Sequence, residues 1–468
     1  MKLVKSKNCD INYLAKIVKL DTFEKHQDPE VTKIKVATVD GYKVIVGIDS
    51  KPGFYVYFPA LSQINPDFLS YANLFRDNTL NKDENKKGFF EKNGKVTAIK
   101  LRGQVSEGFL IEAEILNNWL VDSVNKDIEI NKEVEFDSVE HDGKEIWINK
   151  KYVKKEENNN SQKTSNKQGK EPKGVDKIVP GQFRFHYDTV LIKKCPNVIH
   201  YNDLISITEK IHGTSAISAN VLCNYERPWQ EKLAYILVNW IPKVKFAGTR
   251  KTYPDYDYIY SSRTVIKNRY RGSEKEDGYY EGDALMRKMC HEYVAKHLDK
   301  GMTAYYEIVG FLPTGAAIQK LGKAYDYGCV QPAAGEEYTV EKHCKVRIYR
   351  LTLTNRDGVV HEFSAREVQQ WCASHELIPV TEWYYGYAKD LYPDLEPTVH
   401  WNENFMERLA TDKRFHMEES SPSCNNEVPH EGIVIRKENM ISEAWKLKCF
   451  AFLNGELKND ETNIEDNA

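Results

Sequence analysis

A lysine that stands just before a glycine turn, between two strand-like segments, is the feature that most restricts how this chain folds. Residues 204–208 are predicted to be a strand that enters the turn, and residues 216–221 a strand that leaves it. Gly213 permits a sharp bend and lets a bulky phosphate approach the backbone. An isolated lysine near a glycine is usually only an exposed side chain. A chemical role for Lys210 therefore needs support from the rest of the chain.

Further short motifs follow this turn in a fixed order. They are Ser261-Ser262-Arg263, Tyr306-Glu307-Ile308-Val309-Gly310, Gly315-Ala316-Ala317-Ile318-Gln319-Lys320, Arg347-Ile348-Tyr349, Glu431-Gly432-Ile433-Val434-Ile435-Arg436 and Trp445-Lys446-Leu447-Lys448. With Glu209-Lys210-Ile211-His212-Gly213-Thr214, this series resembles the motifs of the covalent nucleotidyltransferases, which include RNA ligases, DNA ligases and mRNA capping enzymes. His212 is similar to the residue at that place in the RNA ligase 2 family, whereas DNA ligases and capping enzymes usually carry Asp. That family commonly has Asn and Asp where this chain has Ser215 and Arg350.

The resemblance implies an ATP-dependent RNA ligase. Lys210 would attack the α-phosphorus of ATP, the resulting AMP would pass to an RNA 5′-phosphate, and a 3′-hydroxyl would seal the strand. Because a free lysine amine has a pKa of about 10.4, neighbouring cations or desolvation must favour its neutral form. The implied catalytic residues are Lys210, Glu431, Lys446 and Lys448, and Glu431 would also bind Mg²⁺ or Mn²⁺.

The resemblance also implies a set of nucleotide-binding residues. Tyr349 would stack on adenine, and Arg436 would stand behind the two lysines that hold the α-phosphate. Each of these residues, taken alone, is equally compatible with a packed core or a solvated face, and only their joint occurrence favours the functional interpretation. The full implied set is Glu209, His212, Gly213, Arg263, Glu307, Tyr349 and Arg436.

Three alternatives to an RNA ligase remain open at this point. DNA ligases and capping guanylyltransferases carry an oligonucleotide-binding (OB) domain after the last lysine motif, whereas 20 residues follow Lys448 here. His212 also argues against both. The third alternative is a catalytically idle nucleic-acid-binding protein on the same scaffold, and the intact set of lysines and glutamates argues against it.

Residues 1–150 are predicted to form a β-rich, OB-like barrel domain. Residues 34–38 and 42–48 alternate apolar and polar side chains around the Asp40-Gly41 turn, which predicts a hairpin. The segment 53–109 resembles the N-terminal OB module of Deinococcus-type RNA ligases.

Basic and aromatic residues are interleaved within this N-terminal domain. Such a pattern can bind phosphates and stack bases, although a core of aromatics with solvated lysines between them is the alternative. The candidate nucleic-acid-binding residues are Lys95, Lys100 and Arg102, near Phe89, Phe90 and Phe109.

The rest of the chain is divided by composition. Residues 151–178 are predicted to be a polar linker, 179–455 the nucleotidyltransferase domain and 456–468 an acidic tail. The fold class expected is α+β, with the β-barrel followed by a mixed α/β, ATP-grasp-like ligase domain built on antiparallel sheets. In that domain, Ser364 and Glu367 predict a helix capping box. A helix over residues 283–299 is predicted to bury Leu285, Met289, Tyr293 and Leu298.

Composition alone does not indicate a function. The net charge of −3 does not suggest a polyanion partner, so any RNA surface must be local. The nine cysteines are scattered and form no C-x-x-C pair, which argues against a zinc ribbon or a disulfide framework. No run of 18 apolar residues occurs. We therefore expect a cytoplasmic, monomeric protein that acts on nicked or broken RNA, with a role in RNA repair.

Overall fold

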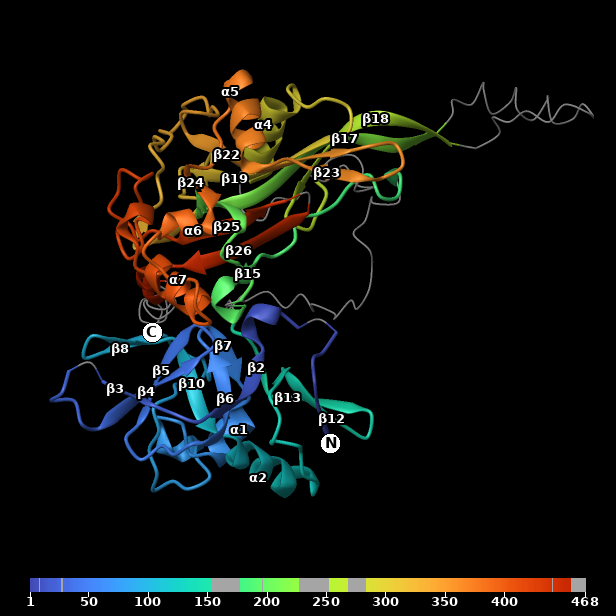
Figure 1. The fold of residues 1–468 in the computed structure, drawn as a ribbon. Coiled ribbons are helices and arrows are strands. Elements are labelled where there is room, and N and C mark those ends of the chain that lie inside the picture. Colours follow the sequence, from blue (N-terminus) through green and yellow to red (C-terminus); the bar gives the residue numbers. More distant parts are fainter. Residues whose placement is uncertain are drawn as a thin grey trace, which may run out of the picture.

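The computed structural model describes most of the chain (Figure 1). The residues that it describes are 1–7, 9–26, 28–153, 177–195, 197–226, 252–267, 283–439 and 441–455. Most of the predicted linker, residues 154–176, and the predicted acidic tail, residues 456–468, lie outside the described residues. No helix in these ranges is both long enough and apolar enough to cross a membrane.

The N-terminal part is built from small antiparallel sheets and two helices. The largest sheet contains, in spatial order, β10 (Gly108–Glu112), β6 (Gly53–Pro59), β2 (Ala15–Leu20) and β11 (Val134–Phe136). There are two three-stranded sheets. One contains β1 (Lys2–Val4), β12 (Ser138–His141) and β13 (Lys144–Trp147). The other contains β3 (Glu24–Lys25), β4 (Ile34–Val39) and β5 (Tyr42–Gly47). The pairs are β7 (Ser62–Ile64) with β14 (Asn149–Lys151) and β8 (Ile99–Leu101) with β9 (Gln104–Ser106). The helices are α1 (Pro66–Tyr71) and α2 (Ala113–Val124).

The predicted hairpin is confirmed, whereas a single barrel is not. β4 and β5 pair from Ile34↔Gly47 to Val39↔Tyr42, and Asp40 takes the positive φ of 50° that the tight turn requires. The strands described between residues 1 and 153 form separate sheets rather than one closed ring. The OB interpretation of this part therefore stays a prediction.

The C-terminal part contains two five-stranded sheets. The first contains, in spatial order, β15 (Val190–Leu191), β26 (Ser442–Lys448), β25 (Gly432–Glu438), β16 (Leu204–Glu209) and β24 (Glu382–Tyr387). The second contains β18 (Thr252–Ser262), β17 (Thr214–Glu226), β19 (Met302–Gly310), β22 (Cys344–Thr354) and β23 (Val360–Glu362). All pairings are antiparallel except β15 with β26. The predicted antiparallel, mixed α/β character is confirmed.

Helices cover these two sheets and complete their cores. They are α4 (Asp283–Ala295), α5 (Ala365–Ser374), α6 (Ala388–Leu391) and α7 (Trp401–Leu409), and a short hairpin is formed by β20 (Lys320–Leu321) and β21 (Lys323–Ala324). The predicted capping box at the start of α5 is present, because Ser364 and Glu367 bond reciprocally. The buried clusters of the C-terminal part contain no residue from the N-terminal sheets.

The predicted buried face of α4 is confirmed in part, because Leu298, just after the helix, is buried and Met289 and Tyr293 are partly buried against the same core. Met286, Cys290 and Val294 are buried against the second sheet, whereas Leu285 is exposed. A helical stripe repeats at three and four residues, so two neighbouring stripes of this helix both look apolar, and only packing decides between them. Arg287 is buried on the same helix, which its charge does not predict.

The two parts of the molecule meet at β15 and the short 3-10 turn Ile192–Lys194 that follows it (Figure 1). The Lys193 ammonium lies 2.6 Å from the Glu107 carboxylate, and the Gly41 amide donates to the Lys193 carbonyl at 3.0 Å. The Leu191 amide donates to Asn12 Oδ1 at 2.9 Å. These contacts place the N-terminal part beside the lysines of β26.

Candidate active site

Lys210 begins the loop that carries the chain from the first large sheet to the second. Its amide donates to the Gly432 carbonyl at 2.9 Å, and the His212 amide donates to the Tyr327 hydroxyl at 2.8 Å. Gln319 Nε2 donates to the Gly213 carbonyl at 2.9 Å. A β-carbon on Gly213 would lie 2.5 Å from the Ile308 carbonyl oxygen, so only glycine fits at this turn. The loop is thus fixed at successive residues.

The Lys210 side chain contacts a buried carboxylate. Its Nζ lies 2.6 Å from Glu431 Oε1, with the lysine 20% and the glutamate 5% exposed. Lys448 Nζ lies 3.8 Å from the same oxygen, and His212 Nδ1 lies 3.6 Å from Glu431 Oε2. The β25–β26 register opposes Gly432 to Lys448. These groups therefore come together from the loop after β16, the residue before β25 and the last residue of β26.

The charges in this cluster shift one another's pKa values. Burial by itself would raise the pKa of Glu431, but the neighbouring Lys210, His212 and Lys448 hold it well below its usual range. Burial lowers the pKa of Lys446 to about 8, and the charges of Lys210 and Lys448 act in the same direction. A carboxylate that stays ionised therefore faces several cations.

The lysines and Glu431 of this cluster, but not His212, line a cavity of about 210 Å³ between the two parts of the molecule. The predicted residues that share its wall are Lys210, Arg263, Glu431, Lys446 and Lys448. Residues from the N-terminal part also line it, which the sequence did not indicate. They include Asp10, Asn12, Tyr13 and Lys151. Arg263 is half exposed and paired with Asp188, another residue that the motifs did not single out.

Glu307 and Tyr349 lie on the second large sheet, near the Lys210 loop. Ser215 opposes Glu307 across β17 and β19, and its hydroxyl lies 3.4 Å from the Tyr349 hydroxyl. The His186 ring contacts Tyr349 edge-on, with 5.2 Å between the ring centres. Burial raises the pKa of Glu307 to about 8, although the Lys210 charge opposes the shift. Tyr349 does not line the cavity described above.

Glu209 is buried at the end of β16, directly before the loop that carries Lys210. Its Oε2 accepts hydrogen bonds from the Thr381 hydroxyl at 2.9 Å and the Ser423 hydroxyl at 2.7 Å. Its amide donates to the Thr381 carbonyl at 2.9 Å. Burial raises the pKa of Glu209, and the two hydroxyls oppose that shift. Neither Thr381 nor Ser423 carries a sequence signal, because both come from loops distant in the chain.

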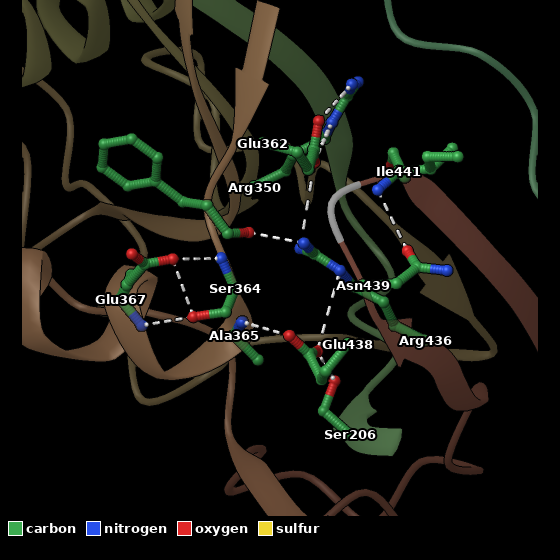
Figure 2. Close-up of polar contacts among 12 residues, drawn as sticks. Ser206, Arg350, Glu362, Ser364, Ala365, Glu367, Arg436, Glu438, Asn439 and Ile441 are labelled. Carbon is green, nitrogen blue, oxygen red and sulfur yellow. Dashed lines mark hydrogen bonds and ion pairs between the residues drawn. The ribbon is translucent and has the colours of Figure 1, made fainter. Parts of the chain in front are cut away.

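Arg436 lies outside the cavity, in a second charged cluster (Figure 2). It donates to the Phe363 carbonyl at 2.5 Å and lies 3.8 Å from Glu362 and 3.7 Å from Glu438. The buried carboxylates of β23 and β25 attract its guanidinium, and its predicted role behind the lysines stays a prediction. Arg350 belongs to the same cluster, because its guanidinium donates two hydrogen bonds to Glu362, of 2.7 and 2.9 Å. This ion pair explains why residue 350 is an arginine here.

The three candidate nucleic-acid-binding residues of the N-terminal part are separated. Lys95 lines a groove of about 1220 Å³, where it is buried with its Nζ 4.7 Å from the centre of the Tyr152 ring. Lys100 and Arg102 are exposed on the β8–β9 hairpin and do not line the groove.

The aromatic residues of this region do share the groove. Phe89, Phe90 and Phe109 pack with ring centres 4.9 to 5.4 Å apart. Phe90 is buried, whereas Phe89 is 56% exposed. The cluster thus serves partly as core and partly as an open aromatic surface.

Comparison with solved structures finds several that are similar to this chain. No family model matches the chain, and no curated protein matches it. A structure of a Naegleria gruberi RNA ligase mutant with ATP and Mn has a TM-score of 0.49 at 13% identity, over 96% of this chain and 100% of that chain. The Naegleria gruberi RNA ligase with PPi has a TM-score of 0.49 at 14% identity, over the same shares. We therefore base the function on the residues of the site.

Proposed function

We propose that this chain is an ATP-dependent RNA ligase that works through a lysyl-AMP intermediate at Lys210. The observation that supports this most is the contact between Lys210 and the buried Glu431 on the wall of a cavity shared with Lys446, Lys448 and Arg263. Several cations that converge on one cavity suit a polyphosphate substrate. We propose residues 179–455 as the nucleotidyltransferase domain and residues 1–150 as an OB-like domain that grips the polynucleotide.

In the first step, the neutral Lys210 amine would attack the α-phosphorus of ATP. A nitrogen–phosphorus bond forms, the bond to the pyrophosphate oxygen breaks, and the amine proton leaves to solvent. Lys446 and Lys448 would neutralise the charge that develops on the phosphoryl oxygens. AMP would then pass to an RNA 5′-phosphate as the nitrogen–phosphorus bond breaks and frees the Lys210 amine. Attack by a 3′-hydroxyl on that 5′-phosphate would form the phosphodiester bond and release AMP. We place this activity at nicked or broken RNA ends, with a role in repair.

The residues of the site are compatible with a divalent cation bound together with the nucleotide. Glu431 Oε2 is buried and has no hydrogen-bond partner among the described residues. No group of three or more acidic, histidine or cysteine side chains that could hold a metal ion by itself occurs in the described ranges. Mg²⁺ and Mn²⁺ commonly use one or two carboxylates plus substrate phosphates. Glu431 would hold such an ion, which would take up the carboxylate charge that now faces Lys210.

The base and ribose would lie along the second large sheet. Tyr349 would stack on adenine, Glu307 would bind the ribose, and Glu209, His212 and Gly213 would shape the loop around the nucleotide. Glu307 Oε2 is buried without a hydrogen-bond partner in the described part of the chain, which leaves an atom for a ligand hydroxyl. A carboxyl with a raised pKa can also donate a hydrogen bond at neutral pH.

Replacing Glu307 by glutamine should make folding stability less dependent on pH. Burial raises the pKa of Glu307 to about 8 from an ordinary 4.5, so the folded protein keeps a proton that the unfolded chain loses. The contribution to stability is complete below pH 4.5 and is lost as the pH rises to about 8. As the pH rises over this range, the free energy of unfolding of Glu307→Gln should therefore increase relative to that of wild type by at most about 5 kcal/mol. Urea unfolding at several pH values measures this, and parallel stability curves would contradict a protonated Glu307.

The groove of the N-terminal part should bind RNA through stacking more than through charge. Phe89→Ala removes the exposed ring and should weaken RNA binding by about 1–3 kcal/mol with an unchanged salt slope. Lys100→Ala and Arg102→Ala should instead lower the salt slope by about one unit each if they contact phosphates. Fluorescence anisotropy with a nicked RNA duplex across a salt series separates the two effects. Unchanged affinity in all three variants would remove this part from RNA binding.

Incubation with α-labelled ATP or GTP, followed by a denaturing gel, tests the proposed function as a whole. An RNA ligase should retain the label from ATP and release it to a 5′-phosphorylated RNA. Label from GTP in place of ATP would indicate a capping guanylyltransferase. A protein that binds RNA but takes label from neither nucleotide would be the idle scaffold.

A further inference from the structure

Helix α4 belongs to none of the motifs, yet one of its side chains reaches the loop that carries Lys210. Arg287 is 5% exposed, and its Nε donates to Asp283 Oδ1 at 2.8 Å, one helical turn earlier. Asp283 is buried as well. A buried ion pair of this kind costs desolvation energy that Coulomb attraction alone seldom offsets, so its further bonds matter.

The other two nitrogens of the guanidinium bond the residues that follow Gly213. Nη1 donates to the Ser215 carbonyl at 2.9 Å, and Nη2 donates to the Thr214 hydroxyl at 2.6 Å. The register of β17 with β18 begins only at Ala216, so Ser215 stands just before that ladder. Arg287 thus supplies a donor where the loop joins the sheet.

Arg287 completes the set of contacts that fix the Lys210 loop. The start of the loop is held by the Gly432 carbonyl, its middle by Tyr327 and Gln319, and its end by Arg287. Ser215 also opposes Glu307 across β17 and β19. A shift of the Arg287 contacts would therefore reach both the nucleophile and the residue proposed to bind the ribose.

We propose that Arg287 is a positioning residue for nucleotidyl transfer, which holds the end of the loop so that Lys210 faces the α-phosphorus. This inference rests on the proposed function. The planar fork of arginine bonds Asp283, Thr214 and Ser215 at once, and the single ammonium of lysine does not reproduce that geometry. A misplacement of about 1 Å at a reacting group can slow a reaction about a hundredfold, so a small change here should affect the rate.

The test compares Arg287→Lys, Thr214→Val and the double variant in the full-length protein. Single-turnover transfer of AMP to the protein at saturating ATP should slow at least about tenfold in Arg287→Lys, with ATP affinity within about threefold of wild type. Thr214→Val keeps the shape of the side chain and removes the hydroxyl, and it should slow the rate less. In the double variant the two effects should not multiply, because both single changes disturb the same Arg287–Thr214 bond. Lys288→Met, on the exposed face of the same helix, is the matched control.

The outcomes separate this inference from the function on which it rests. A folded Arg287→Lys protein that transfers AMP within about threefold of the wild-type rate would overturn the positioning role, as would multiplying effects of the two single changes. Either result would leave the ligase proposal standing. A wild-type protein that takes no label from ATP would remove the function and the inference together.

Discussion

Replacing Lys210 by alanine should abolish labelling of the protein by α-labelled ATP. Lys210 and Lys448 both pair with Glu431, but the Lys210 ammonium lies closer, at 2.6 Å against 3.8 Å. Without the amine, no nitrogen–phosphorus bond forms, so the loss should be complete rather than partial. A denaturing gel after incubation with ATP and Mg²⁺ measures it.

The control for this experiment must account for stability. Lys210 is only 20% exposed and pairs with a buried glutamate, so its removal should cost about 1–3 kcal/mol. Circular dichroism and urea unfolding would show whether Lys210→Ala is folded at the assay temperature. Lys323→Ala, an exposed lysine on β21, should label like wild type. Persistent labelling of folded Lys210→Ala would mean that another residue is the nucleophile.

The second large effect is expected when Glu431 or Lys448 is changed to alanine. Both are proposed to act on the charge that develops during transfer, and removing one such group commonly slows a reaction about 10²- to 10³-fold. RNA binding should stay near wild type, because the proposed RNA groove lies in the N-terminal part, away from these residues. Sealing of pre-adenylylated RNA isolates the last step from lysine adenylylation.

These variants also need a control for folding and for general charge loss. Glu431 is buried among cations, so Glu431→Gln is the milder companion of Glu431→Ala, with the same volume and no charge. Lys437→Ala removes a cation from the neighbouring strand β25 without touching the cavity. Sealing by either alanine variant within about threefold of wild type would show that their assigned roles are wrong.

The sequence predicted best those features that are local in the chain. The Asp40-Gly41 hairpin and the Ser364–Glu367 capping box are each specified by a few adjacent residues, and both are confirmed. Five of the residues that the ordered motifs singled out also line one cavity, namely Lys210, Arg263, Glu431, Lys446 and Lys448.

Features that depend on tertiary packing could not be predicted in the same way. Leu285 of α4 is exposed whereas Met286 is buried, and Arg436 contacts the carboxylates of β23 and β25 rather than the cavity. Asp10 and Lys151 reach the cavity only because the N-terminal part docks on β15, and nothing near them in sequence signals this. Arg287 was missed for the same reason, since a lone arginine on a helix usually faces solvent.

Peptide mass spectrometry of the wild-type protein after incubation with ATP and Mg²⁺ tests the central proposal most directly. The peptide that contains Lys210 should gain the mass of one adenylyl group, which is AMP less one water, through a phosphoramidate bond, and addition of pyrophosphate should remove it. An AMP adduct on any other residue, or none while ATP is consumed, would contradict covalent nucleotidyl transfer at Lys210.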